Sequence, residues 1–546
     1  MCSMANSQPR IPSQHGTLEY LRLQYDNAIA SGIKRPLLFP QVFFSFALLA
    51  GFLIIDHRQN RFLYQLRWSV WFAVIAVEVS NIRHRISLDP AVSYVSGVAS
   101  VYVIIWSTMW LIFGRPQFTA ARLERRRKAL QNGIRAASGG TTQERPETIG
   151  NKMNGNGHSL KQQKGHDTAL PTTEKNLAET KDSNAEWEYF WQPYPHVFGE
   201  RLAWVLDLIF SFRGRGWNFS IPTNPALPED VAASLGETLS ESNRSLTSRT
   251  GYQCFRTREA LARYAISRFI LCYLILDLCK FQIIHDPFYR TGDESLQAPA
   301  YLEGLSPFLI TRIRRNTLNL ALVTFIHFHA LLIPMVASLL LGPRVLGIRG
   351  EPWMYVTTWG YPSAILHKGL SGFWGTWWHQ TFRAGFTAPT NYLIRKGWLP
   401  SNGIASQLVG ITIAFIISGA MHATGSFVQV LPTHPQRQFA YFLLQLVAVV
   451  VQTSFCAVLR PWIERLPVWA RRTGNGVFGY MWLYATAPLF MNDMSAGGTW
   501  LYEPIIVSPF RWLGLGPKGY GWWTWAHVDI GWYQGKYWWE SGIGGL

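Results

Sequence analysis

Cysteine is scarce in this chain, with five copies among 546 residues, and the five show no paired spacing. The sequence therefore offers neither a disulfide framework nor a cysteine-based metal site, and we predict no bound metal. Cys272 and Cys279 are seven residues apart and share a face if their region is helical. We expect both to behave as inert apolar side chains.

Acidic residues are also few, because 32 Asp and Glu stand against 50 Lys and Arg, a formal charge of +18. An excess of this size can indicate nucleic-acid binding. The basic residues, however, lie at the ends of apolar stretches, as in Lys34–Arg35, Arg58–Arg67 and Arg312–Arg315. Cations at such places hold helix ends at an anionic membrane surface. The pattern favours membrane lipid as a partner and argues against nucleic acid.

Charge is almost absent from several long stretches that can each cross a hydrocarbon core of about 30 Å. One such stretch can be a buried core helix, but six in one chain indicate a polytopic membrane protein. The six are Leu37–Ile55, Val92–Phe113, Ile266–Phe281 with its flanks, Leu318–Leu341, Ile404–Met421 and Phe439–Leu459. Shorter candidates are Trp68–Val79, Leu202–Phe212 and Val477–Phe490. We predict an all-α transmembrane helical bundle with roughly seven to nine spans.

Aromatic residues are nearly missing from residues 135–185, which are rich in Gly, Asn, Lys and Thr. Such a segment cannot bury enough apolar surface to offset the entropy of ordering, so we predict a disordered loop. The loop divides the chain into a polar N-terminal segment (1–33), a group of N-terminal transmembrane helices (34–134) and a second transmembrane region (186–546).

His422 lies at the end of the apolar run that begins near Ile404. An ionisable group at membrane depth is costly and tends to be retained for a function, which singles out His422. On a helix, its neighbours three and four residues away are all small, namely Ser418, Gly419, Gly425 and Ser426. Small neighbours leave room for a substrate beside the ring. A helix-packing seam in which His422 is an interhelical hydrogen-bond partner is an equally good interpretation.

A second histidine lies in an aromatic but polar segment, Ser371–Phe386. Its His379 and Arg383 are four residues apart and share a face if the segment is helical. The segment is too polar for a plain lipid-facing span. It predicts an interfacial or re-entrant helix, which membrane proteins tolerate where it lines a protein-walled cavity. A simple anchor at the membrane interface is the alternative.

Four sequence blocks together resemble a known family. The block at 373–383 reads FWGTWWHQTFR, and about forty residues later 418–422 reads SGAMH. Upstream, 201–219 reads RLAWVLDLIFSFRGRGWNF, and YLILDLCK and DPF fall between 273 and 288. The combination resembles the wax-synthase-like branch of membrane-bound O-acyltransferases, in particular fungal members that acetylate terpenoid alcohols in secondary metabolism. Recognisable blocks cover roughly residues 190–430.

The resemblance implies a helical bundle of membrane-bound O-acyltransferase type in which acyl-CoA and a lipophilic alcohol meet in a membrane-embedded tunnel. It makes 186–546 the catalytic region and implies no bound cofactor, with acetyl-CoA or another acyl-CoA as co-substrate. The family's membrane histidine maps onto His422, and its tryptophan-histidine block maps onto Trp374, Trp378, His379 and Gln380. Other branches often carry asparagine where this chain has His379. The expected location is the membrane of the endoplasmic reticulum.

The residue types suit acyl transfer to a hydroxyl. A neutral imidazole can remove the alcohol's proton as the oxygen attacks a thioester, which typically contributes about 10²–10⁴-fold. We predict His422 as this base and His379 as its catalytic partner, with His379 or Gln380 donating to the oxyanion. The predicted substrate-binding residues are Trp374, Trp378, Gln380, Arg383 and Ser418. Since no Ser-His-Asp or Cys-His pattern is evident, direct transfer is preferred over a covalent acyl-enzyme.

Two other functions fit parts of the sequence. A long-chain wax or sterol ester synthase would use the same chemistry with a longer acyl-CoA. A membrane transporter with a histidine in its pathway is the alternative from another class, but transporters commonly consist of two similar halves, and no internal duplication is evident here.

Charged residues in the other apolar runs have their own expectations. We expect Asp277 to pair with Lys280, three residues further along a helix. Arg213 or Arg215 is a candidate for a CoA phosphate. Glu78 lies in a candidate span without an evident partner.

Overall fold

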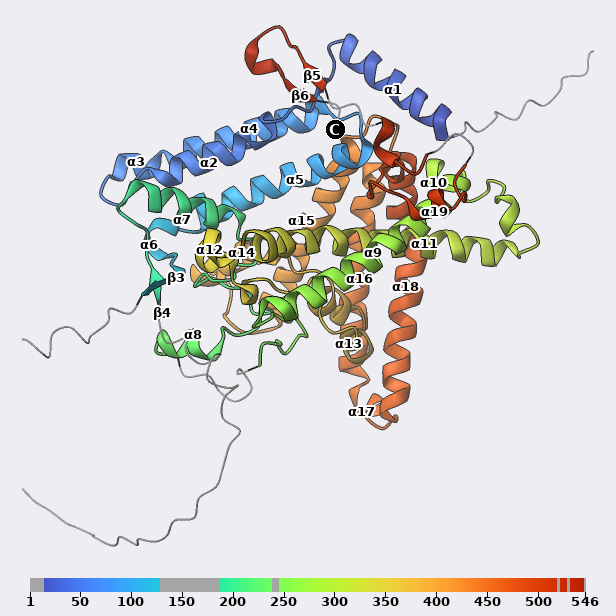
Figure 1. The fold of residues 1–546 in the computed structure, drawn as a ribbon. Helices are drawn as coiled ribbons and strands as arrows, with labels where there is room; N and C mark the ends of the chain where they lie inside the picture. The colour runs from blue at the N-terminus through green and yellow to red at the C-terminus, as the bar shows by residue number, and fades with distance from the viewer. Residues whose placement is uncertain (1–13, 128–186, 238–244, 518–520, 528–530, 545–546) are drawn as a thin grey trace, which may run out of the picture.

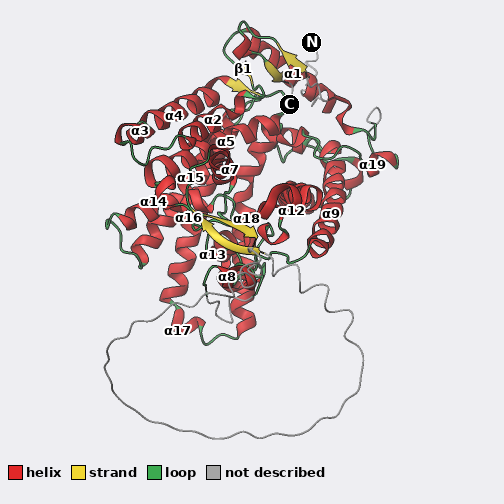
Figure 2. Ribbon diagram, turned by 60° about the vertical axis from the view of Figure 1, so that its left-hand side comes forward, coloured by secondary structure: helices red, strands yellow, loops and turns green. Residues whose placement is uncertain are grey.

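The protein is described by a computed structural model, which covers residues 14–127, 187–237, 245–517, 521–527 and 531–544. The predicted loop at 135–185 lies outside the described residues. Within them, the chain is helical almost throughout (Figures 1 and 2). The predicted helical membrane fold is confirmed.

Five helical segments in the described part of the chain are long and apolar enough to cross a membrane. The first two are Arg61–His84, made of α3 (Arg61–Gln65) and α4 (Arg67–His84), and Pro90–Phe113, made of α5 (Pro90–Thr108) and η2 (Met109–Phe113). The third is Pro307–Gly350, made of α11 (Pro307–Pro334), η6 (Met335–Leu341), α12 (Gly342–Leu346) and η7 (Gly347–Gly350). The last two are single helices, α15 (Ile404–Phe427) and α16 (Pro435–Val458). Each contains one of the apolar runs expected from sequence.

Two further helices have the length of a span but a more polar composition. α9 (Arg258–His285) holds the predicted run 266–281, and Arg268, Asp277 and Lys280 interrupt its apolar middle. α18 (Val468–Ala496) holds the predicted run 477–490 and ends in a polar turn that includes Asp493. The predicted count of seven to nine spans includes these helices, whereas composition and length alone admit five.

The first predicted span is shorter than expected. Residues 37–55 contain only a short apolar helix at Gln41–Ile54, made of η1 (Gln41–Phe43) and α2 (Phe44–Ile54). At 1.5 Å per residue, a helix of this length falls short of a hydrocarbon core of about 30 Å. The predicted run at 202–212 lies in α7 (Phe198–Phe210), which is also too short.

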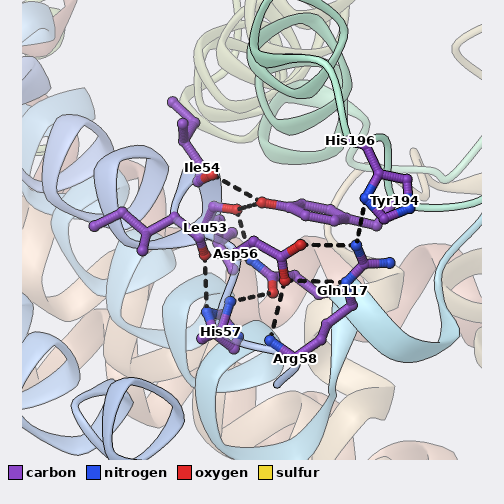
Figure 3. A network of polar contacts seen from close by, with 9 residues as sticks. Leu53, Ile54, Asp56, His57, Arg58, Gln117, Tyr194 and His196 are labelled. Atoms are coloured by element: carbon purple, nitrogen blue, oxygen red, sulfur yellow. Dashed lines mark hydrogen bonds and ion pairs between the residues drawn. The ribbon is translucent and has the colours of Figure 1, made fainter. Parts of the chain in front are cut away.

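Side chains from distant segments close the end of α2 (Figure 3). The Tyr194 hydroxyl donates to the carbonyl oxygens of Leu53 (2.8 Å) and Ile54 (2.9 Å). The Gln117 carboxamide donates to those of Leu53 (2.9 Å) and Ile55 (2.8 Å). These bonds satisfy carbonyls that a helix leaves without partners at its C-terminus. They explain how a short helix can end within the apolar core.

The remaining elements are short connections. The shorter helices are α1 (Gln14–Ala30), α6 (Pro116–Thr119), α8 (Glu229–Ser234), α10 (Phe288–Thr291), α13 (Ser363–Gly372), α14 (Arg383–Arg395), α17 (Arg460–Ile463) and α19 (Pro509–Trp512). Sheet in the described residues is limited to three two-stranded pieces. They pair β1 (Arg35–Pro36) with β2 (Arg85–Ile86), β3 (Arg122–Arg127) with β4 (Trp187–Gln192), and β5 (Gly531–Tyr533) with β6 (Gly542–Gly544).

Helices from both ends of the chain meet in the core. α2, α4 and α5 lie side by side, and α16 and α18 run together to a tip formed by α17 (Figure 1). α15 packs between α5 and α16. A Cβ on Gly97 of α5 would lie 2.6 Å from the carbonyl oxygen of Thr424, and a Cβ on Gly425 would lie 2.9 Å from that of Tyr94. Glycine therefore permits the close α5–α15 approach.

Candidate active site

His422 of α15 is held by side chains from three other helices. Its Nδ1 atom lies 2.9 Å from the Tyr94 hydroxyl of α5. Its ring stacks on Phe442 of α16, with centroids 4.8 Å apart and planes at 9°. Phe490 of α18 meets the ring edge-on at 5.1 Å. The imidazole therefore has one defined orientation, and its Nδ1 edge faces Tyr94.

The small residues around His422 serve helix packing. Gly425 faces α5, and a Cβ on Gly419 would lie 3.0 Å from the Phe439 ring of α16. Ser426 donates to Asp493. From the sequence, these residues could either leave free volume beside the ring or form a helix-packing seam. In the structure, Gly419, Gly425 and Ser426 form a packing seam.

A chain of buried hydrogen bonds leads away from His422. The Tyr94 hydroxyl donates to Oε1 of Gln438 over 2.6 Å, and Nε2 of Gln438 donates to Asp493 over 2.8 Å. Asp493 also accepts from the Ser426 hydroxyl (2.6 Å) and from the His434 backbone N–H (2.5 Å). Gln438 and Asp493 are at most 1% exposed. The Tyr94–Gln438 and Gln438–Asp493 hydrogen bonds are therefore buried, and the Tyr94–His422 hydrogen bond is part-buried.

This chain determines where the proton of a neutral His422 lies. An ionised carboxylate only accepts, so the Gln438 amide must turn its nitrogen to Asp493 and its oxygen to Tyr94. Tyr94 has one hydroxyl proton and gives it to Gln438, so towards His422 it can only accept. The proton of His422 therefore lies on Nδ1, and Nε2 carries the free lone pair.

His379 lies in a break between two helical segments. η9 (Phe373–Trp377) is a π-helical turn that continues α13, and α14 begins only at Arg383. His379 and Arg383 therefore do not share a helical face, contrary to the expectation of one re-entrant helix. The Arg383 guanidinium donates to Oε1 of Gln380 (2.6 Å) and to the carbonyl oxygen of Gly375 (3.1 Å), which closes the turn.

The surroundings of His379 keep its ring neutral. The ring packs against Trp378 (5.2 Å between centroids) and Phe382 (5.7 Å). Burial, and after it the positive charge of Arg213, lower the pKa of His379 to about 3.

Aromatic rings form a continuous wall between the two histidines. The His379 ring contacts Trp378, and Trp378 contacts Trp374 at 5.7 Å. Trp374 in turn contacts Phe442 at 6.0 Å, the ring on which His422 stacks. The tryptophan-histidine block and the membrane histidine are therefore parts of one cluster of side chains.

Two nitrogens in this cluster are buried without a hydrogen-bond partner among the described residues, Nε1 of Trp374 and Nδ1 of His379. Buried polar groups are nearly always satisfied, so such atoms call for an explanation. The indole nitrogen can only donate, and a neutral imidazole can also donate. Both atoms are suited to meet an acceptor atom of a bound molecule.

The other predicted substrate-binding residues differ in their availability. Gln380 donates to the carbonyl oxygens of Trp374 (3.1 Å) and Trp378 (2.7 Å), so its amide hydrogens are already used. Gln380 therefore holds the turn, and His379 remains as the donor of the predicted pair. Ser418 is half-buried one helical turn before His422.

The expected Asp277–Lys280 pair does not form. Asp277 accepts from the Ser508 hydroxyl (2.5 Å) and the Phe510 backbone (2.9 Å). Lys280 lies 3.5 Å from Glu503. Its ammonium donates to the carbonyl oxygens of Trp500 and Tyr502. Both side chains thus attach the C-terminal segment to α9.

The two arginines proposed for CoA contact backbone carbonyls. Arg213 donates to Thr357 (3.0 Å), and buried Arg215 donates to Trp353 (3.3 Å) and Pro225. Arg215 thus has a structural role.

Part of this site lies in a segment that matches a known protein family. Residues 358–444 match the model of the membrane bound O-acyl transferase family. This segment contains both histidines and Gln438, whereas Tyr94 and Asp493 lie outside it. No solved structure matches the chain. The predicted resemblance to membrane-bound O-acyltransferases is confirmed.

The relatives are fungal proteins. The chain is 26% identical over 274 residues to the O-mevalon transferase yanI of Aspergillus niger, a match that covers 48% of this chain and 54% of the relative. It is 25% identical over 279 residues to the O-mevalon transferase macI of Penicillium terrestre, with the same coverage. The acetyltransferase atnC of Arthrinium sp is 24% identical over 257 residues, 43% of this chain and 54% of the relative. The chain thus spans about half the length of these relatives.

Proposed function

We propose that this protein is a membrane-bound O-acyltransferase that moves an acyl group, acetyl in the first instance, from acyl-CoA to a hydroxyl of a lipophilic alcohol. The observation that carries the proposal is the fixed orientation of His422, whose Nδ1 is bonded to Tyr94 and whose Nε2 is left as a base. The family match over 358–444 and the fungal relatives support the same chemistry.

The reaction is a direct transfer. The alcohol gives its proton to Nε2 of His422 while its oxygen attacks the thioester carbonyl. The resulting oxyanion accepts hydrogen bonds from Nε1 of Trp374 and from His379, the two donors without partners. Collapse of the tetrahedral species breaks the C–S bond, and His422 returns the proton to the CoA thiolate. The products are an ester and free CoA.

The buried carboxylate assists the base without contacting the substrate. When His422 takes up the proton, its Nδ1–H remains bonded to Tyr94, and the chain through Gln438 ends on Asp493. Such a chain of hydrogen bonds becomes polarised towards the negative charge and so stabilises the imidazolium. Tyr94, Gln438 and Asp493 are positioning residues in this scheme.

The acceptor is a hydrophobic alcohol, because the site lies within a membrane-embedded bundle that such a molecule enters from the bilayer. A terpenoid alcohol of secondary metabolism fits this description. The relatives named acetyltransferases support acetyl as the transferred group. We place the enzyme in the endoplasmic reticulum. Two relatives are named O-mevalon transferases, so a test of this protein should include acyl donors other than acetyl-CoA.

Microsomes that carry the protein provide the test. They are incubated with labelled acetyl-CoA or palmitoyl-CoA and a panel of terpenoid, sterol and fatty alcohols, and esters are identified by mass. His422→Ala should abolish the product at an unchanged protein level, whereas exposed His367→Ala should not. Full activity of His422→Ala would contradict the proposal. A product only with palmitoyl-CoA would favour a wax or sterol ester synthase.

A further inference from the structure

Glu78 is a buried carboxylate in a membrane-spanning helix without a cationic partner. It lies in α4 and is 3% exposed. Its one hydrogen bond within the described residues comes from Nδ2 of Asn81, which lies 3.2 Å from Oε2. A carboxylate at such a place is costly and tends to be retained for a function. The proposed acyl transfer makes no use of it.

Glu78 faces a cavity that lies apart from the histidine site. The cavity has a volume of about 70 Å³ and is lined by α4, α5, residues of the segment 37–46 and Val428. This is several times the space that one water molecule requires. Its polar wall consists of Glu78, Asn81, Arg85, Ser96 and Ser100. Apolar side chains such as Leu37 and Phe46 line the rest of the cavity.

The two charged side chains of this wall lie at different depths below the surface. Glu78 and Ser100 are buried, whereas Arg85, at the end of α4, is half-buried and thus nearer the outside. Within the described residues, the hydrogen bond of Arg85 goes to the carbonyl oxygen of Pro36 at 3.1 Å. Arg85 and Glu78 form no ion pair with each other. A cation-binding group therefore lies deep in the cavity and an anion-binding group lies towards its exposed side.

We propose that this cavity binds the headgroup of an aminophospholipid, with the ammonium at Glu78 and the phosphate at Arg85. A free cation would be repelled by Arg85, and a free phosphate would be repelled by Glu78. A phosphoethanolamine group satisfies both side chains. Its ammonium can also donate to the Asn81 and Ser100 oxygens, which a trimethylated choline cannot do.

The position of the cavity agrees with a lipid ligand. α4 is one of the apolar helices that can span a membrane, and Arg85 directly follows it. Basic residues at such helix ends lie at the level of the phosphates. The segment before α2 exposes Phe39 and Phe43, and α2 itself exposes Phe44, so that acyl chains can cover an apolar surface here.

The same lipid would stabilise the helix that supports the base. Ser96 and Ser100 belong to α5, which also carries Tyr94 and contacts α15 through Gly97. Lipid bound on one side of α5 therefore favours the helix position in which Tyr94 contacts His422. This consequence depends on the proposed function, but the binding itself does not.

Lipid retention and thermal unfolding test the binding. The purified full chain is placed in nanodiscs of phosphatidylcholine, alone or mixed with phosphatidylethanolamine or phosphatidylglycerol. Retained lipids are identified by native mass spectrometry, and the unfolding midpoint is recorded. We expect phosphatidylethanolamine to be enriched over phosphatidylcholine and to raise the midpoint by several degrees, whereas phosphatidylglycerol does neither.

Variants locate the effect. In Glu78→Gln the two zwitterionic lipids should be retained equally, and the midpoint difference between them should disappear, even if the variant is less stable in every lipid. Glu464→Gln, at an exposed ion pair with Arg460, should keep the wild-type preference. Equal retention of both lipids by the wild type would overturn the proposal. So would an unchanged preference in Glu78→Gln, or an equal effect of phosphatidylglycerol.

Discussion

The carboxamide nitrogen of Gln438 donates to the carboxylate of Asp493 over 2.8 Å, and this contact fixes which way the amide faces. With the nitrogen committed, the amide oxygen accepts from Tyr94, and Tyr94 accepts from His422. A buried acid on α18 thus sets the proton position on a histidine that it does not touch.

Asp493→Asn should separate catalysis from binding. Asparagine can donate as well as accept, so Gln438 is free to turn its nitrogen to Tyr94 and to move the proton of His422 onto Nε2. We expect kcat to fall by about 10²–10⁴-fold, the range of general base catalysis, with KM for acyl-CoA nearly unchanged. Steady-state kinetics on membranes measure both constants.

The control for this variant is Asp230→Asn, since Asp230 forms a half-exposed pair with Arg256 outside the site. It should leave both constants unchanged. A wild-type kcat in Asp493→Asn would show that the hydrogen-bond chain does not determine the state of His422.

Tyr94→Phe removes the hydroxyl that joins His422 to Gln438. Both partners lose a hydrogen bond inside the core, and a buried polar group left unsatisfied costs about 1–3 kcal/mol. We expect a lower unfolding midpoint and a kcat at least about tenfold lower, equal to about 1.4 kcal/mol. Tyr102→Phe on the same helix is the matched control, because the Tyr102 hydroxyl has no partner among the described residues. That variant should keep or raise the midpoint, because it removes a hydroxyl that is already unsatisfied. A Tyr94→Phe midpoint as high as that of Tyr102→Phe would refute the assignment.

The buried His379 should make the protein sensitive to acid. Its pKa is lowered from 6.5 in the unfolded chain to about 3. Between these values the unfolded state binds a proton that the folded state does not, so stability is complete above pH 6.5 and falls as the pH drops towards 3. The slope reaches about 1.4 kcal/mol per pH unit.

The measurement is the unfolding midpoint of the wild type and His379→Gln from pH 4 to 8. The variant has no ionisable group there, so its loss of stability in acid should be smaller. Parallel curves for the two proteins would mean that His379 titrates normally.

Arg314→Met should be among the most destabilising single changes. Arg314 is 2% exposed and forms two hydrogen bonds with the fully buried Asp286, at 2.8 and 2.9 Å. Removal of one partner from a buried ion pair leaves the other charge uncompensated, at a cost of about 3–5 kcal/mol. Arg460→Met breaks an exposed pair with Glu464, which water and salt screen, so the unfolding midpoint should hardly change. Similar midpoints for the two variants would contradict this difference.

The sequence predicted the parts that depend on local composition. Apolar runs located the spanning helices, and an ionisable group at membrane depth singled out His422. The hydrogen-bond partner of His422 could not be predicted in this way, because Tyr94 lies 328 positions away from it in the chain. The pairing of Asp277 was predicted wrongly for the same reason, since spacing along a helix does not show which distant segment packs against it.

Local backbone geometry explains why His379 and Arg383 do not share a helical face as predicted. The spacing of His379 and Arg383 suggested one helical face, but a π-helical turn and the break after Trp377 separate them. Gln380 and Arg383, both predicted to bind substrate, are used in closing that break. Composition does not distinguish an α-helix from such a turn.

The pairing of β3 with β4 has a practical consequence for engineering. Arg127 and Trp187 are direct cross-strand partners, so the ends of the described chain on either side of residues 128–186 lie next to each other. A reporter inserted between Arg127 and Trp187 would therefore begin and end at neighbouring points on a sheet that lies outside the helices that hold His422.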